Sequence, residues 1–158
     1  IIFVSLDGAF SEKNGIPSSE WKFHQDIYIN RADANAIVHA HSTNATAVST
    51  HKKRIPAFHY MVAMAGGSDI KCAKYATFGT RALSKNILLA LKNRKACLIS
   101  NHGQIAFEEN IYKAFELAEE VENISLQYIT SLKLGKPKIL SLNEMKKVLS
   151  KAKNYKKE

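Results

Sequence analysis

The chain has 158 residues, 46% hydrophobic and 23% charged, which is typical of one globular domain spanning residues 1–158 with a buried core. No apolar run is long enough to cross a bilayer, so we expect no membrane partner. The net charge of +9 comes mostly from lysine, without the clustered arginines and interleaved aromatics that read or stack on bases, so we expect no nucleic-acid partner.

The N-terminal part of the chain predicts a strand, a loop and a helix. The apolar run IIFVSL, residues 1–6, has the composition of a strand, and because it starts at Ile1 rather than Met we expect a further segment upstream. Residues 11–20 are rich in turn-forming residues and predict a loop. Ser18 or Ser19 then caps a helix. The side chains that follow at helical spacing are Trp21, His24, Ile27 and Tyr28.

Beyond this helix, short strands and helices follow one another in an irregular order, which favours an α+β fold over a regular βαβ winding. Strands are expected at 36–38, 70–75 and on either side of a break within 95–107, and helices at 45–50, 83–91, 111–134 and from a capping box that begins at Ser141. The core stripe of the long helix is expected to consist of Ile111, Ala114, Phe115, Ala118, Val121, Ser125, Tyr128 and Leu132.

The chain contains two cysteines, Cys72 and Cys97, and they show no CxxC spacing. Neither their number nor their spacing indicates a secreted scaffold held by disulfides, and no signal peptide is recognisable. We therefore expect a cytoplasmic protein.

The stretch AIVHAHSTNATAV, residues 36–48, places two histidines at the end of a predicted strand. Side chains alternate between the two faces of a strand, so His39 and His41 point the same way. Two imidazoles on one face are half of a metal site. The alternative is that both line a polar rim of the core, because histidine is also a common buried residue.

A third histidine, His102, is followed by Gly103 at the break between two predicted strands. Glycine allows the backbone to turn tightly there and brings the imidazole to a rim. Three histidines at strand ends, with a fourth position open, are typical of a catalytic rather than a structural zinc site. Taken alone, His102 is better explained as an ordinary polar residue of a hairpin turn, because turns often carry polar residues.

Four other residues have both a structural and a functional interpretation. Glu20 is an acid in the first turn of a helix, where it complements the helix dipole. Ser18 and Ser19 are simple caps, or they form a phosphate site with the free N–H groups of the same helix end. Tyr60 is a core aromatic or a proton donor. Local sequence leaves these alternatives open.

Five segments in this order, PSSEW, RADANAIVHAHSTNATAVS, IPAFHYMVAMAGG, YATFGTRALS and ALKNRKACLISNHGQIA, resemble the class II aldolase/adducin family. The resemblance extends from Pro17 to about Tyr155. It implies an α+β fold of three layers, with a central, mainly antiparallel sheet flanked by helices. It also implies a carbon–carbon lyase that cleaves a ketose 1-phosphate such as L-fuculose 1-phosphate to dihydroxyacetone phosphate and L-lactaldehyde.

The same resemblance assigns the metal site. In that family His39, His41 and His102 correspond to the ligands of one Zn²⁺ per subunit, which binds the oxygens of dihydroxyacetone phosphate and stabilises its enediolate. Glu20 corresponds to the glutamate that closes the metal site when substrate is absent and acts as acid and base when it is present. A carboxylate within hydrogen-bond reach of the reacting carbon suits that proton transfer.

The resemblance also implies the residues that contact substrate. Tyr60 corresponds to the residue that protonates the departing aldehyde oxygen, Ser18 and Ser19 to part of the phosphate clamp, and Phe78 to an aromatic on the aldehyde side. Tyr155 corresponds to a tyrosine that reaches the site of a neighbouring subunit. The family forms cyclic tetramers with sites at the interfaces, so we expect a homotetramer.

Two departures and two alternatives accompany this interpretation. The family completes its phosphate pocket with a GNxS-type loop, which we expect to lie ahead of Ile1, and it has a glycine where Lys156 follows Tyr155 here. The alternative enzyme is a pentulose-phosphate 4-epimerase, although PSSEW favours the aldolase because those epimerases follow PSS with Asp. The alternative from another class is a non-catalytic adducin-like module or an inactive fragment, and such modules lack the metal histidines.

Overall fold

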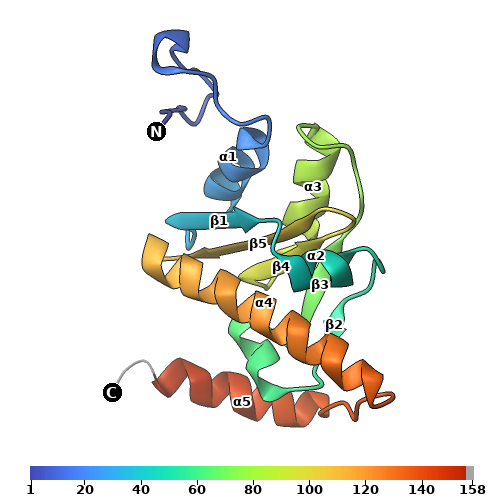
Figure 1. Ribbon diagram of the computed structural model, residues 1–158. Helices are drawn as coiled ribbons and strands as arrows, with labels where there is room; N and C mark the ends of the chain where they lie inside the picture. Colours follow the sequence, from blue (N-terminus) through green and yellow to red (C-terminus); the bar gives the residue numbers. More distant parts are fainter. Residues whose placement is uncertain (156–158) are drawn as a thin grey trace.

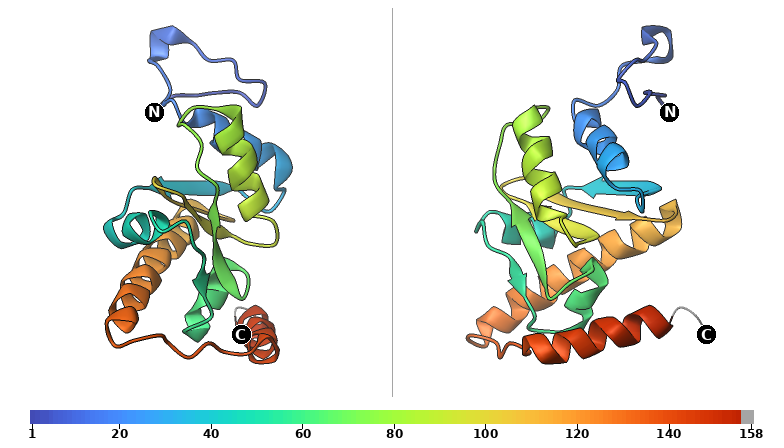
Figure 2. Two further views of the ribbon diagram at one scale, coloured as in Figure 1. Left: turned by 90° about the vertical axis from the view of Figure 1, so that its right-hand side faces the viewer. Right: turned by 180° about the vertical axis from the view of Figure 1, so that it is seen from behind.

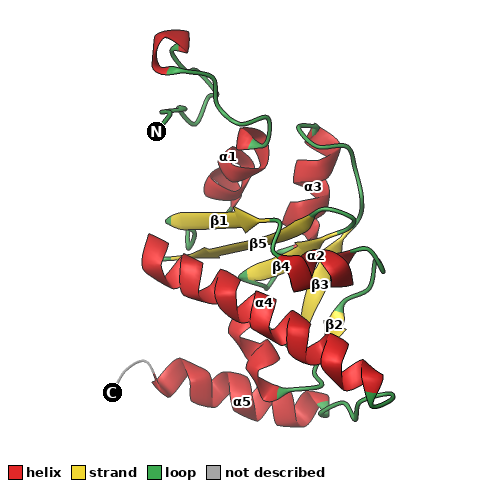
Figure 3. Ribbon diagram, in the orientation of Figure 1, coloured by secondary structure: helices red, strands yellow, loops and turns green. Residues whose placement is uncertain are grey.

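The computed structural model describes residues 1–155 (Figures 1 and 3). Most elements lie within a few residues of their expected positions, because hydrophobic periodicity and turn residues set them locally. In chain order they are η1 Glu12–Asn14, α1 Trp21–Asn30, β1 Ala36–Ala40, α2 Thr43–Ser49, β2 Ile55–Pro56, η2 Tyr60–Ala65, β3 Asp69–Ala73, α3 Arg81–Ala90, β4 Ala96–Ile99, β5 Gly103–Glu108, α4 Ile111–Lys133 and α5 Leu142–Tyr155.

A single sheet holds these strands in the order β1-β5-β4-β3-β2. Its neighbouring strands run antiparallel, except that β3 and β4 are parallel. The parallel pair follows from the chain path, because α3 connects β3 to β4 as a crossover helix, whereas a three-residue turn connects β4 to β5. The expected mainly antiparallel sheet is therefore confirmed.

Helices cover both faces of the sheet, as Figure 2 shows from two sides. α1 and α3 pack against one face, and α2 and α4 pack against the other, where η2 lies beside α4 against β3 and α5 packs on η2. Alternation along each strand divides the apolar side chains between these layers, since Ile37 and Ile105 face α1 and α3 while Val38 and Ala106 face α2 and α4. The three-layer α+β architecture is confirmed. Within residues 1–155, no helix combines the length and apolarity that a membrane crossing requires.

The register between β1 and β5 brings distant histidines together. Ala40 lies opposite Gln104 and His39 opposite Ile105, so the end of β1 adjoins the turn that begins β5. Gly103 permits this approach, because a Cβ atom there would lie only 2.4 Å from the backbone oxygen of Ala40. His102 in that turn is thereby placed beside the end of β1.

The expected strand at residues 1–6 is wrong. These residues form an irregular arm in which Ile1 and Phe3 are exposed (Figure 1). Their apolar composition suits a strand, but a strand also needs a partner for its backbone N–H and C=O groups. No strand within residues 1–155 pairs with this arm.

Two local expectations also need correction. The N-cap of α1 is Glu20 rather than a serine, and the Ser18 hydroxyl instead accepts a bond from the Glu20 N–H at 3.3 Å. In α4 the expected stripe is only partly buried, because Ile111 and Phe115 near its start and Leu132 near its end are exposed. The sheet meets the middle of α4, and the buried face there is completed by Leu117 and Ile124, which the expected stripe omitted.

Candidate metal centre

Four side chains converge at the end of β1. The nearest ligand atoms of Glu20, His39, His41 and His102 all lie within 4.8 Å of one another. His39 Nε2 is 3.0 Å from both Glu20 Oε2 and His41 Nε2, and His102 Nε2 is 2.9 Å from Glu20 Oε1. The sequence-predicted zinc ligands and the predicted acid–base residue are therefore adjacent.

Each member of the cluster comes from a different local structure. Glu20 is the N-cap of α1, His39 belongs to β1, His41 lies in the two-residue link from β1 to α2, and His102 lies in the β4–β5 turn. The glutamate and the rings of His39 and His102 are largely buried, whereas His41 is exposed. The cluster is thus open to solvent on the His41 side.

Hydrogen bonding fixes the tautomer of His39. Its Nδ1 is 2.8 Å from the backbone oxygen of Gln104, which only accepts, so Nδ1 carries the proton. Burial lowers the pKa of His39, so the ring is neutral near pH 7 and its Nε2 is unprotonated. This bare nitrogen faces Glu20 Oε2, which is another acceptor. A cation between the two atoms would remove their repulsion.

The donor set fits a metal ion. Tetrahedral ligands about 2.0–2.1 Å from Zn²⁺ lie about 3.3 Å from one another, close to the spacings in this cluster. Glu20 Oε1 is buried and makes no hydrogen bond within residues 1–155. Burial also lowers the pKa of His102, which favours its neutral, metal-binding form. Nitrogen ligands with one carboxylate suit zinc better than calcium or magnesium.

The serines lie next to the cluster, and the turn that carries the predicted aldehyde-side aromatic lies against them. Ser18 and Ser19 directly precede Glu20 at the N-terminus of α1. Phe78 is exposed in a turn before α3, and a Cβ atom on its neighbour Gly79 would lie 3.1 Å from the Ser19 backbone oxygen. The turn that carries Phe78 therefore packs against the serine pair.

The two predicted tyrosines lie elsewhere in the chain. Tyr60 is exposed at the start of η2, which packs with α4, α5 and β3 rather than with α1. Tyr155 is the last residue of α5, and its side chain lies outside the described part of the chain. Both elements lie on the far side of the sheet from α1, so the structure does not bring Tyr60 to the cluster of the same chain (Figure 1).

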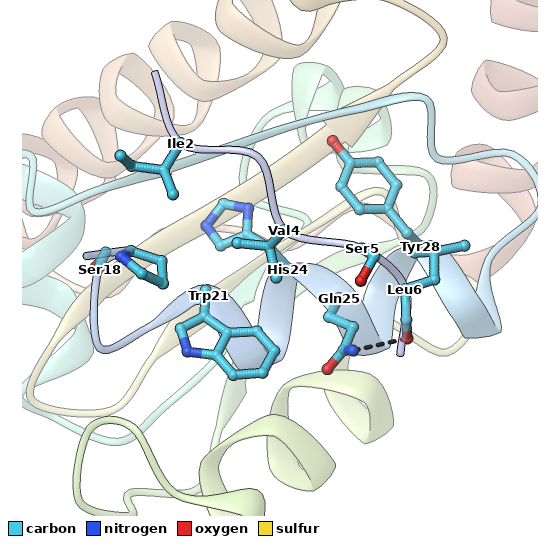
Figure 4. A pocket seen from close by; sticks show the side chains of 10 residues that line it. Ile2, Val4, Ser5, Leu6, Ser18, Trp21, His24, Gln25 and Tyr28 are labelled. Carbon is cyan, nitrogen blue, oxygen red and sulfur yellow. Dashed lines mark hydrogen bonds between the residues drawn. The ribbon is translucent and has the colours of Figure 1, made fainter. Parts of the chain in front are cut away.

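A pocket of about 330 Å³ lies between the N-terminal arm and α1 (Figure 4). Gln25 Nε2 donates to the Leu6 backbone oxygen at 2.7 Å and ties the arm to the helix. Trp21 and His24 line the helix side, and Ser18 lines one end. The pocket thus reaches one of the residues predicted to bind phosphate.

His24 in this pocket predicts a loss of stability in acid. Burial, with a smaller effect of the nearby His39, lowers the pKa of His24 to about 4. The unfolded chain binds that proton near pH 6.5, so below this pH the unfolded state is favoured increasingly until about pH 4. We expect the free energy of unfolding of metal-free protein to fall by roughly 2 kcal/mol from this residue between pH 7 and 4.5. Urea unfolding at the two pH values measures it.

The control for this prediction is His51→Gln, since His51 is exposed. His24→Gln should show a smaller loss between pH 7 and 4.5 than wild type, while His51→Gln should match wild type. An equal loss in wild type and His24→Gln would contradict the assignment.

Gly103 predicts a second measurable effect. A methyl group at this position would meet the Ala40 oxygen at 2.4 Å and the His41 ring at 3.1 Å. The Gly103→Ala protein should therefore lose about 1–3 kcal/mol of stability by overpacking, together with zinc affinity, because the His41 and His102 segments are forced apart. Thermal melts and zinc titration measure both. The control is Asn101→Gly in the same turn, which relieves a positive φ of 54° and should lose neither stability nor zinc affinity. If Gly103→Ala matched wild type in both measurements, the prediction would be contradicted.

Local sequence reasoning missed two residues around the cluster, Gln104 and Glu122. Gln104 is buried and orients His39 through its backbone, and Glu122 in α4 binds the first turn of α2. A polar residue within the apolar run QIAF was a signal for Gln104. Glu122 is one of several acids in its helix and carried no comparable signal.

Comparison with known proteins identifies similar chains. A family model described as the class II aldolase and adducin N-terminal domain matches residues 1–129. The L-fuculose phosphate aldolase of Escherichia coli is 51% identical over 156 residues, which are 98% of this chain and 72% of that protein. The 5-methylthioribulose-1-phosphate/5-deoxyribulose-1-phosphate aldolase of Rhodospirillum rubrum is 46% identical over 155 residues, 98% of this chain and 70% of that protein.

A solved structure of an L-fuculose 1-phosphate aldolase has the same fold. It superposes with a TM-score of 0.91 at 39% sequence identity, over 96% of this chain and 71% of that chain. Sequence and structure thus lead to the same group of sugar-phosphate aldolases.

Proposed function

The chain belongs to the class II aldolase and adducin family, and from this premise we propose that it cleaves L-fuculose 1-phosphate, or a similar ketose 1-phosphate, to dihydroxyacetone phosphate and L-lactaldehyde with Zn²⁺ as cofactor. The enzyme class is that of a carbon–carbon lyase, and metal dependence is characteristic of the family. The observation that carries the proposal is the convergence of Glu20 with three histidines. This donor set argues against the adducin-like alternative, which lacks such a site.

In the proposed reaction, His39, His41 and His102 hold the metal ion. When bound, Zn²⁺ supplies Lewis-acid polarisation of the ketose oxygens. Glu20 stands beside all three imidazoles on the buried side of the cluster. We assign Glu20 as the group that exchanges a proton at C3 of the dihydroxyacetone phosphate half, because it is the carboxylate of the cluster and adjoins the histidines that would hold the metal ion.

The rest of the substrate is assigned to residues around the cluster. Ser18, Ser19 and the N-terminal N–H groups of α1 would bind the phosphate, and Phe78 would line the aldehyde side. The elements that carry Tyr60 and Tyr155, η2 and α5, lie on the far side of the sheet from α1, which supports a homotetramer in which a neighbouring subunit supplies these tyrosines to each site. In this assignment Tyr60 exchanges the proton of the aldehyde oxygen.

Similarity to the Rhodospirillum rubrum enzyme supports a second candidate substrate class. L-Fuculose 1-phosphate, 5-methylthioribulose 1-phosphate and 5-deoxyribulose 1-phosphate share the half that becomes dihydroxyacetone phosphate. They differ in the aldehyde that departs. The metal, the phosphate site and Glu20 therefore serve all three, and the surroundings of Phe78 decide among them. We also propose a cytoplasmic location, which the two free cysteines support.

The proposal is tested by assaying zinc-loaded protein on all three substrates. Dihydroxyacetone phosphate is measured with a coupled dehydrogenase, and each aldehyde is identified by mass spectrometry. We expect the highest kcat/KM for L-fuculose 1-phosphate. Preference for a ribulose 1-phosphate would favour the second candidate. A pentulose phosphate is assayed as a fourth substrate, and its epimerisation without aldehyde release would favour the epimerase. Less than about half an equivalent of bound zinc would favour the non-catalytic module.

A further inference from the structure

Glu122 of α4 binds the N-terminus of α2, the helix that begins two residues after His41. Glu122 Oε1 accepts from the Asn44 backbone N–H at 2.8 Å and from the Asn44 side chain at 2.7 Å, and Oε2 accepts from the Ala45 N–H at 2.8 Å. Burial opposes ionisation, but these bonds hold the pKa of Glu122 below its usual range. A charged carboxylate from the neighbouring helix of the same layer therefore caps the first turn of α2.

His41 depends on this cap more than the other ligands do. The His39 ring is fixed by a hydrogen bond to the Gln104 backbone, outside the cluster. Within residues 1–155 the His41 ring has no hydrogen bond to a group outside the cluster, and it is exposed. Its placement must therefore come from the backbone on either side.

The backbone around His41 is held at two points. Before it, Ala40 pairs with Gln104 in the β1–β5 ladder. After it, Ser42 accepts a hydrogen bond from Gln104 Nε2 at 2.7 Å, and Glu122 accepts from the Asn44 and Ala45 amides. The same Gln104 side chain donates to the backbone oxygen of Ala118 in α4 at 2.9 Å. The link that carries His41 is thus held by β5 before the histidine and, through Gln104 and Glu122, by α4 after it.

We propose that Glu122 is a positioning residue of the metal centre, which holds the β1–α2 link so that His41 Nε2 stays within ligand distance of His39 and Glu20. The inference rests on one part of the proposed function, namely that the cluster of Glu20 and the three histidines binds Zn²⁺. Residues that orient metal ligands without touching the metal typically contribute 10–100-fold to affinity. Glu122 acts one step further out, through the backbone rather than through the ring.

The test is Glu122→Gln, which keeps the shape of the side chain. One end of the amide is a donor and opposes a backbone N–H, so at least one bond of the cap is lost. Zinc affinity is measured by competition with a chromophoric chelator, and ligand geometry by the visible absorption of the Co²⁺ form. We expect zinc binding about 10–100-fold weaker than wild type and an altered Co²⁺ spectrum. In metal-free protein, the Asn44 and Ala45 amides should exchange hydrogen faster.

Two control variants separate positioning from general loss of stability. Glu119→Gln makes the same charge change at an exposed position of α4. Asn110→Ala removes the N-cap of α4, where Asn110 Oδ1 accepts from the Lys113 N–H at 3.0 Å, near the end of β1 remote from the histidines. Asn110→Ala should lower the melting temperature about as much as Glu122→Gln, yet both controls should keep zinc affinity within about twofold of wild type.

The outcomes distinguish this inference from the proposed function. Tight zinc binding by wild type, with Glu122→Gln unchanged in affinity and Co²⁺ spectrum, would overturn the inference alone. Equal weakening in Asn110→Ala would also overturn it, because the effect would then come from stability. Wild-type protein that binds no zinc would overturn the proposed function and the positioning role together.

Discussion

Replacing His41 with alanine should remove most of the bound zinc and, with it, the aldolase activity. His41 Nε2 is 3.0 Å from His39 Nε2 and is one of four ligand atoms within 4.8 Å of one another. Loss of a direct ligand should cost more than the 10–100-fold that loss of an orienting residue costs, so we expect affinity to fall by more than about 100-fold. Elemental analysis after gel filtration and chelator competition measure the loss.

The fold should survive this substitution, because His41 is exposed and lies in the link between two elements. The melting temperature of metal-free His41→Ala should therefore be close to that of metal-free wild type. His51→Ala is the matched control, since His51 is also exposed and lies just beyond the end of α2, outside the cluster. Full zinc retention by His41→Ala would refute the ligand assignment.

Replacing Glu20 with glutamine should nearly abolish the chemistry while leaving the protein folded. General acid–base groups contribute about 10²–10⁴-fold to rates, so we expect kcat to fall by that factor. Exchange of the C3 proton of dihydroxyacetone phosphate with D₂O, followed by NMR, should fall equally. Zinc binding should weaken less than in His41→Ala, because the three histidines and one amide oxygen remain.

The metal-free form of Glu20→Gln gives an independent measurement. In wild type, Glu20 Oε2 faces the unprotonated Nε2 of His39 at 3.0 Å, acceptor against acceptor. A glutamine amide can donate to that nitrogen, so the metal-free variant should melt at or above the wild-type temperature. Glu12→Gln, at an exposed position of η1, is the control for loss of charge alone. If Glu20→Gln exchanged the proton at the wild-type rate, Glu20 would not be the acid–base group and would serve only as the N-cap residue of α1.

The candidate site was predictable from sequence where its geometry is local. The two-residue spacing of His39 and His41 places both rings on one face of any strand. The two rings do lie together, with centroids 4.9 Å apart, although His41 is one residue beyond β1. The break at His102-Gly103 predicts a turn, which the structure has. The roles of Glu20 and the serines, in contrast, came from the resemblance to a family, because local sequence alone left each with a structural alternative.

Contacts between distant segments could not be predicted in this way. No local signal states that Ala40 lies opposite Gln104, yet that register brings His102 to His39. Similarly, Glu122 follows Asn44 by 78 residues, and its choice of partner depends on how α4 lies across the sheet. The exposure of the two ends of α4 also depends on tertiary packing, because only the middle of the helix contacts the sheet.

The sequence by itself determined which residues can act as ligands, where most helices and strands lie, and which faces are apolar, because backbone periodicity and turn chemistry operate over a few residues. The tertiary structure decided that residues 1–6 form an arm rather than a strand, that four ligand atoms meet within 4.8 Å, and that Glu122 anchors the link carrying His41. These features depend on strand pairing and on packing between layers, where each segment takes the conformation that its partners permit.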